Sequence, residues 1–93
     1  MTDPQPHDLP RSDLHRLANR LARALDDLHS LAYYLKVADD WQQGRLAPHR
    51  HRYILAMDMI HKADQLAAQR VPKGPIRNPA AVFATWIKTL RML

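Results

Sequence analysis

The chain has no cysteine, no glutamate and only two glycines among its 93 residues. The lack of cysteine excludes disulfides, thiolate metal sites and cysteine nucleophiles, and it fits a reducing, cytoplasmic compartment. Because all nine acidic residues are aspartate, there is no HExxH zinc motif, and Gly44 and Gly74 stand too far apart for a glycine-rich phosphate loop. The six histidines lack metal-ligand spacing, since His49 and His51 point to different faces of a helix and His61 lies too far along it. We therefore expect a protein that is not an enzyme and that uses no cofactor and no metal.

Long apolar runs are also missing, so no segment approaches the roughly 18 residues that cross a bilayer. Residues 1–10 (MTDPQPHDLP) contain three prolines and no apolar stretch, which argues against both a signal peptide and regular structure. The sequence thus predicts a cytoplasmic protein with a disordered N-terminal lead, residues 1–11, followed by a single domain, residues 12–93.

Leucines and alanines at heptad spacing mark one face of the first expected helix. The members of this leucine stripe are Leu14, Ala18, Leu21, Leu25, Leu28, Ala32 and Leu35. No proline or glycine interrupts residues 12–43, Ser12 is a good N-cap, and Gly44 is a helix stop signal. The pattern predicts one long helix over residues 12–43.

Two further helices are expected downstream. Pro48 suits the first position of the second helix, which ends before the connector at residues 71–77. Asn78 and Pro79 supply a cap and a first position for the third helix. Its apolar face holds Val82, Phe83, Trp86, Ile87 and Leu90. Since no strand alternation occurs, we predict an all-α three-helix bundle with a long first helix and antiparallel neighbours.

Positive charge is concentrated in the second half, where residues 44–93 hold nine basic and two acidic side chains. In the first helix, basic side chains at i, i+4 and i+7 (Arg16, Arg20, Arg23) share one face. If the second helix folds back on the first, the start of the first helix meets the end of the second helix and the connector. We expect a basic pole there, at which arginine can bind phosphate oxygens bidentately. The predicted nucleic-acid contacts are Arg16, Arg20, Arg70, Lys73 and Arg77.

The leucine stripe has two interpretations, because the third helix is too short to cover all of the first. It is either packed inside the bundle or a surface for a second protein or a second copy of this chain. The adjacent tyrosines next to it would extend such a surface. The predicted partner-binding residues are Leu14, Leu21, Leu28, Leu35, Tyr33 and Tyr34.

Amino-acid usage is typical of a GC-rich bacterial genome, since glutamate is absent and arginine outnumbers lysine by ten to four. Residues 76–83 (IRNPAAVF), followed by Trp86 and Ile87, resemble a short helical stretch in replication and regulatory proteins of bacterial plasmids and integrative elements. This resemblance implies a DNA-associated role in a mobile element, although a recognition helix with a tight glycine turn is absent. The leading interpretation is a non-enzymatic nucleic-acid-binding accessory or regulatory module. The alternative is a protein-interaction module, either a homodimer or a partner-binding bundle, that uses the leucine stripe.

Overall fold

The computed structural model describes residues 8–93, with side chains from residue 13 onward. The regular elements within this range are all helices and include no strand, so the predicted all-α class is confirmed. The elements in chain order are α1 (Asp8–Ala24), the short 3-10 helix η1 (Leu28–Ser30), α2 (Leu31–Gln42), α3 (Arg52–Ala68) and α4 (Pro79–Arg91). Described residues therefore form four α-helices, and the predicted three-helix bundle with a long first helix is not what is observed.

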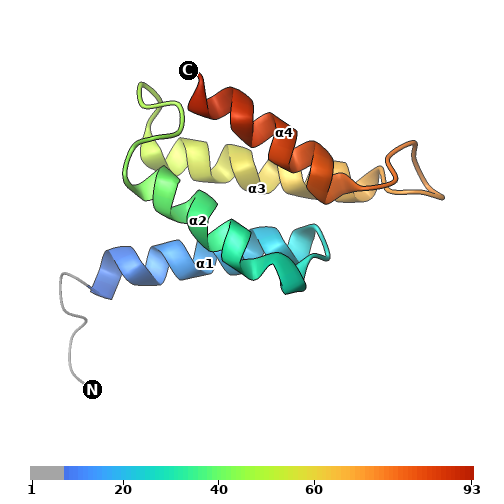
Figure 1. The fold of residues 1–93 in the computed structure, drawn as a ribbon, viewed down its shortest axis with the longest axis horizontal. Coiled ribbons are helices and arrows are strands. Elements are labelled where there is room, and N and C mark those ends of the chain that lie inside the picture. Colours follow the sequence, from blue (N-terminus) through green and yellow to red (C-terminus); the bar gives the residue numbers. More distant parts are fainter. Residues whose placement is uncertain (1–7) are drawn as a thin grey trace.

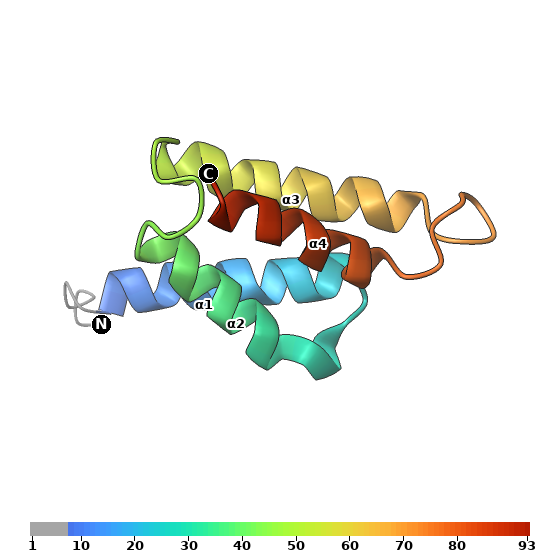
Figure 2. The same cartoon turned by 45° about the horizontal axis from the view of Figure 1, so that its top comes forward.

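The helices form two layers (Figures 1 and 2). Helices α1 and α3 are in contact and run in the same direction, while α2 and α4 return in the opposite direction (Figure 1). The two views together place α2 and α4 on one side of α1 and α3 (Figures 1 and 2). The principal contacts follow the order α2, α1, α3, α4. The exposed sides of α1 and α3 consequently share one face of the bundle.

The predicted first helix is broken because the chain reverses at residues 25–30. Asp26 adopts a left-handed backbone with φ 52°. The N–H of Asp27 donates to the carbonyl of Ala22 (2.8 Å) and the N–H of Asp26 donates to that of Arg23 (3.1 Å). This pair of bonds is the Schellman arrangement that ends helices, in which glycine is the usual left-handed residue. A C-terminal capping motif therefore ends α1, but its left-handed residue is aspartate and not the glycine by which such motifs are usually predicted.

Replacing Asp26 with glycine is expected to raise the free energy of unfolding by about 0.5–1 kcal/mol, because glycine adopts positive φ without the Cβ penalty. The lost contact with Arg70 is long (3.6 Å) and the Asp26 side chain is 88% exposed, so its removal costs little. Urea unfolding followed by circular dichroism measures the change. A loss of stability in this variant would contradict the role assigned to the left-handed residue.

The first helix begins earlier than the sequence predicts. Helix α1 already begins at Asp8, so Ser12 lies within the helix and residues 8–11 of the predicted lead are helical. Pro10 is compatible with this start, because the N–H that proline lacks has no intrahelical partner in a first turn. Residues 1–7 of the predicted lead lie outside the described residues.

The second predicted start is also displaced. Pro48 lies in a turn closed by the N–H of Arg50 and the carbonyl of Ala47 (2.8 Å), and α3 begins only at Arg52. The side chain of His51 caps α3 by accepting from the N–H of Tyr53 (3.3 Å). By contrast, the cap and first position predicted for the last helix are confirmed, since Asn78 accepts from the N–H of Ala81 (3.2 Å) and Pro79 follows it.

The core fills the space between the layers. Its largest fully buried side chains come from all four helices and from the α2–α3 loop, and they are Leu21, Tyr34, Val37, Leu46, Met59, Phe83 and Ile87. Most of the apolar face predicted for the last helix is buried or partly buried, but Val82 is 41% exposed. Burial of these side chains from every helix supplies the main driving force for the fold.

Candidate functional site

Three arginines lie along the exposed side of α1. Arg16, Arg20 and Arg23 are all exposed and line one shallow hollow of the surface together with His15 and Asn19. Their spacing places them on one helix face over about 10 Å at 1.5 Å rise per residue. The face is therefore a row of guanidinium groups at intervals of about one helical turn.

One of these arginines is tied to the neighbouring helix. Nη2 of Arg20 donates to Oδ2 of Asp64 on α3 at 2.7 Å, and both side chains are 47% exposed. Among the side chains that the structure describes, neither Arg16 nor Arg23 has an ion-pair partner. The row on α1 thus keeps two full positive charges uncompensated.

Three more cations lie between α3 and α4. Because α3 ends at Ala68, the connector is longer than the predicted residues 71–77, and from here on the name covers the closed loop of residues 69–78. The N–H of Val71 donates to the carbonyl of Ile76 (2.9 Å), and the N–H of Ile76 donates to that of Gln69 (3.0 Å). Glycine is required at position 74, since an added Cβ would lie 2.4 Å from the carbonyl oxygen of Gln69. The basic residues of this loop, all exposed, are Arg70, Lys73 and Arg77.

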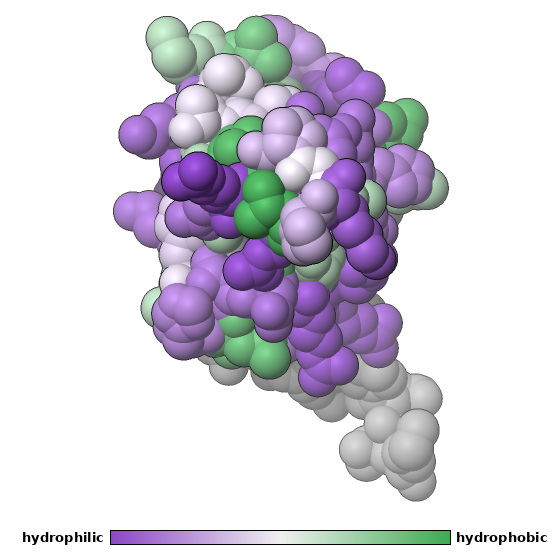
Figure 3. All heavy atoms as spheres, turned by 90° about the vertical axis from the view of Figure 1, so that its right-hand side faces the viewer, coloured by the Kyte–Doolittle hydropathy of each residue, from purple (hydrophilic) through white to green (hydrophobic). Residues whose placement is uncertain are grey.

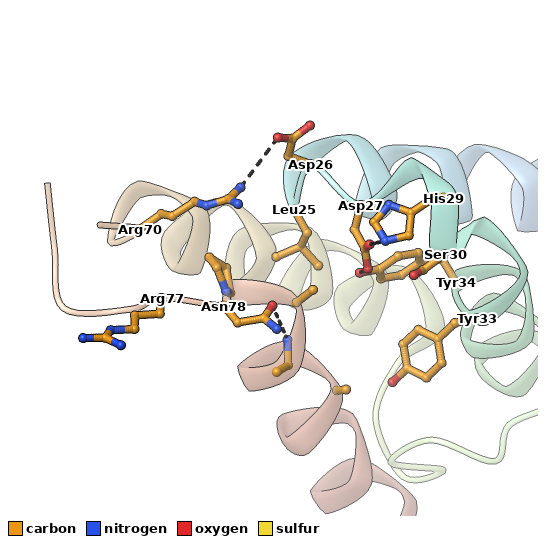
Figure 4. Close-up of a pocket in the computed structure, with 14 residues that line it drawn as sticks. Leu25, Asp26, Asp27, His29, Ser30, Tyr33, Tyr34, Arg70, Arg77 and Asn78 are labelled. Atoms are coloured by element: carbon orange, nitrogen blue, oxygen red, sulfur yellow. Dashed lines mark hydrogen bonds and ion pairs between the residues drawn. The ribbon is translucent and has the colours of Figure 1, made fainter. Parts of the chain in front are cut away.

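The two groups of cations are joined at the α1–α2 reversal. Nη1 of Arg70 lies 3.6 Å from Oδ2 of Asp26, which follows the end of α1 (Figure 4). The sequence-based prediction placed the start of the first helix beside the connector, and this is wrong. Because α1 ends at Ala24 and runs parallel to α3, it is the end of α1 that lies beside the connector (Figure 1).

Together these side chains form what we call the basic surface, and its members are Arg16, Arg20, Arg23, Arg70, Lys73 and Arg77. The predicted nucleic-acid contacts lie on two adjoining segments. Arg16 and Arg20 belong to the row on α1, and the other three belong to the connector. Two members are paired with aspartate, and the other four have no ion-pair partner within residues 13–93. Figure 3 shows that the end of the molecule carrying the connector is mostly hydrophilic, with only small separate hydrophobic patches.

A cleft of about 580 Å³ lies next to the connector, between the amino-terminal parts of α2 and α4 (Figure 4). Asp27 lies in its wall and is satisfied from within the chain. Oδ2 of Asp27 accepts from the hydroxyl of Tyr34 (2.8 Å), and Oδ1 lies 3.1 Å from Nε2 of His29. Burial and the hydrogen bond to Asp27 raise the pKa of Tyr34, so the phenol stays protonated and keeps donating. The polar groups of this wall therefore serve to hold the α1–α2 reversal closed.

The cations at the cleft face outward from this wall. Arg70 points toward Asp26, and Arg77 extends away from the tyrosines (Figure 4). Asn78, between them and α4, uses its side-chain oxygen for the helix cap. The cleft contributes two members to the basic surface, and its interior offers no free cation among the described residues.

The residues predicted to bind a partner are mostly used within the chain. Leu21 and Tyr34 are buried in the core, and three others are partly buried against it, namely Leu14, Leu35 and Tyr33. Leu28, in η1, is 54% exposed. The leucine stripe thus packs α1 against α2 after the chain reverses. The larger exposed apolar face lies on α3, outside the residues predicted to bind a partner.

Comparison with known proteins gives no match, whether with protein-family models, curated proteins or solved structures. None of the helices in residues 8–93 has the length and apolar character that a membrane span requires. No set of three histidine or aspartate side chains in that range is grouped to hold a metal ion.

Proposed function

We propose that the protein binds nucleic acid through its phosphate backbone, using the basic surface of α1 and the connector. The observation that carries this proposal is the set of four cations that have no ion-pair partner among the described side chains and lie on two adjoining segments. Arginine binds phosphate oxygens bidentately, and clustered positive charge on one face attracts a polyanion. In this role the module is non-enzymatic and acts as an accessory or regulatory domain of a bacterial mobile element.

Backbone binding suits this surface better than reading of bases. The row on α1 spans about 10 Å, while the phosphates of each strand of a duplex repeat about every 3.4 Å of helix axis, so its arginines can reach different phosphates. Asn19, the amide side chain within the row, donates to the carbonyl of His15 (2.9 Å). This hydrogen bond holds the amide group against its own helix, which hinders the paired contacts that an amide makes with an adenine edge. The proposal therefore expects weak dependence on sequence.

A salt titration tests the proposal directly. Neutralising four to six phosphates predicts a slope of log K against log salt of about −4 to −5 for duplex DNA and a shallower slope for single strands. Fluorescence anisotropy with labelled duplex DNA, single-stranded DNA and RNA of equal length gives the three slopes. An affinity that stays constant between low and moderate salt would show that phosphate contacts are not involved.

A further inference from the structure

The cleft next to the connector is open because α2 and α4 do not pack closely against each other. Its α4 wall consists of short side chains, namely Ala80, Ala81 and Ala84, and Tyr33 extends from α2 into the space between the two helices (Figure 4). The volume of about 580 Å³ lies within the range of about 300–1,000 Å³ that is usual for small-ligand sites. The cleft therefore has room for a planar ring between an aromatic side chain and a wall of methyl groups.

The core holds the ring of Tyr33 in place. Its centroid lies 5.3 Å from that of Tyr34 at an interplanar angle of 78°, and Tyr34 packs in turn against Phe83 with centroids 6.3 Å apart. Tyr34 and Phe83 are both buried, whereas Tyr33 is only partly buried. A side chain that is fixed before binding loses little conformational entropy when a ligand packs on it. Tyr33 is therefore a preorganised surface on which a second ring can stack.

The charges around the cleft favour an uncharged ring over a free anion. Its lining contains Asp26 and Asp27 as well as Arg70 and Arg77, so the formal charges cancel. The amino-terminal end of α4 does not supply an anion site, because the side chain of Asn78 already caps it. An isolated phosphate is therefore a poor ligand for the interior of the cleft.

The mouth of the cleft is continuous with the basic surface, since Arg70 and Arg77 belong to both (Figure 4). Arg77 has no ion-pair partner among the described side chains, and Arg70 has only the long contact with Asp26 (3.6 Å). We propose that the cleft takes one unpaired base of a single-stranded nucleic acid, stacked on Tyr33, while Arg70 and Arg77 hold the neighbouring phosphates. This inference rests on the proposed function and adds to it a site that a fully paired duplex cannot use.

One polar group is available for the edge of the base. Ser30 is the N-cap residue of α2, but its side chain makes no capping hydrogen bond and has no other partner among the described residues. It lines the cleft and is partly buried. A hydroxyl both donates and accepts, so it can bind the edge of any base. Stacking likewise tolerates every base, and we therefore expect little preference among the four.

A strand without bases separates stacking from phosphate contact. Fluorescence anisotropy compares a short single strand with a strand of equal length that carries an abasic sugar at every position. The strand with bases should bind about 5- to 150-fold more tightly, which is the contribution of one stacked base. Equal affinities of the two strands, with duplex DNA still bound, would overturn this inference and leave the proposed function intact. Failure of all three ligands to bind would refute the proposed function itself.

Filling the cleft tests where the base binds. Ala84→Leu adds bulk to the α4 wall, so it should lower the affinity for the strand with bases to that for the abasic strand and leave duplex binding unchanged. Ala32→Leu, at an exposed position of α2 outside the cleft lining, is the matched control and should change none of the three affinities. Circular dichroism checks the fold, and Ala81→Leu fills the same cleft if Ala84→Leu proves unfolded. Equal effects of the cleft variant and the control on the single strand would overturn the inference.

Discussion

Replacing Asp40 with alanine is expected to lower the free energy of unfolding by about 2–4 kcal/mol. The carboxylate is buried, with 6% of the residue exposed, and both of its oxygens are occupied. Oδ2 accepts from Nη2 (2.9 Å) and Nε (3.3 Å) of Arg91, and Oδ1 accepts from Nη1 of Arg45 (3.1 Å). The bonds from Arg91 join α2 to the end of α4, so their loss frees the last turn of α4 and leaves Arg91 without its aspartate.

The neighbouring aspartate provides a matched control. Asp39 lies on the same helix and contacts the same Arg45, but at 3.5 Å and with its side chain 50% exposed. Exposed pairs of this kind contribute about 0–1 kcal/mol, so Asp39→Ala should change stability by less than 1 kcal/mol. Guanidinium unfolding of the two variants measures the difference. Equal losses would mean that net charge, and not the buried contact, is responsible.

The same contact predicts a dependence of stability on pH. Burial disfavours ionisation of Asp40, but hydrogen bonds and positive charge from Arg91 and Arg45 outweigh it and hold the pKa below its ordinary value. In the unfolded chain this carboxyl titrates near pH 3.9. The stabilisation is therefore complete above about pH 5 and is lost as pH falls through the lower pKa of the folded state. Stability of the wild type and of Asp40→Asn should accordingly converge under acidic conditions.

Residue chemistry explains which helix boundaries could be predicted. Gly44 has φ 73° and ends α2 through the same bonding pattern that Asp26 uses at the end of α1. The first was found from the sequence because glycine is a strong signal, and the second was missed because aspartate tolerates the left-handed region only as a minority choice. Heptad spacing concealed the break further, since Leu25 and Leu28 keep the apolar period across it. Periodicity alone cannot show where a chain reverses.

Topology explains the outcome for the candidate site. The connector cations were predicted together because they are close in sequence, and their closeness does not depend on helix direction. The predicted position of Arg16 did depend on helix direction. The prediction placed Arg16 next to the connector, but in the structure Arg16 is farther from the connector along α1 than Arg20 and Arg23 are. The partners of Arg20 and Arg70, which are Asp64 and Asp26, are distant in sequence. No local pattern could have identified these pairs, because they exist only after α1 packs against α3.

Reversing the charge of the two unpaired arginines on α1 should weaken nucleic-acid binding by about 50- to 100-fold near 0.1 M salt. The variant is Arg16→Glu with Arg23→Glu, and both side chains are exposed and without ion-pair partners among the described residues. Each lost phosphate contact should also reduce the salt slope by about 1, which gives a reduction of about 2. The fold should remain intact, since neither residue supports a described contact with another helix.

A variant with the same change in net charge separates local contact from general attraction. Lys36→Glu with Lys88→Glu also reverses two exposed cations that have no ion-pair partner in the described part of the chain, but these lie on α2 and α4. Long-range attraction responds similarly to both variants and is screened beyond about 10 Å at 0.1 M salt. Only direct phosphate contact predicts that the α1 variant loses much more affinity and salt dependence than the α2–α4 variant. Equal losses in anisotropy titrations would mean that positive charge attracts the polyanion without the basic surface forming the interface.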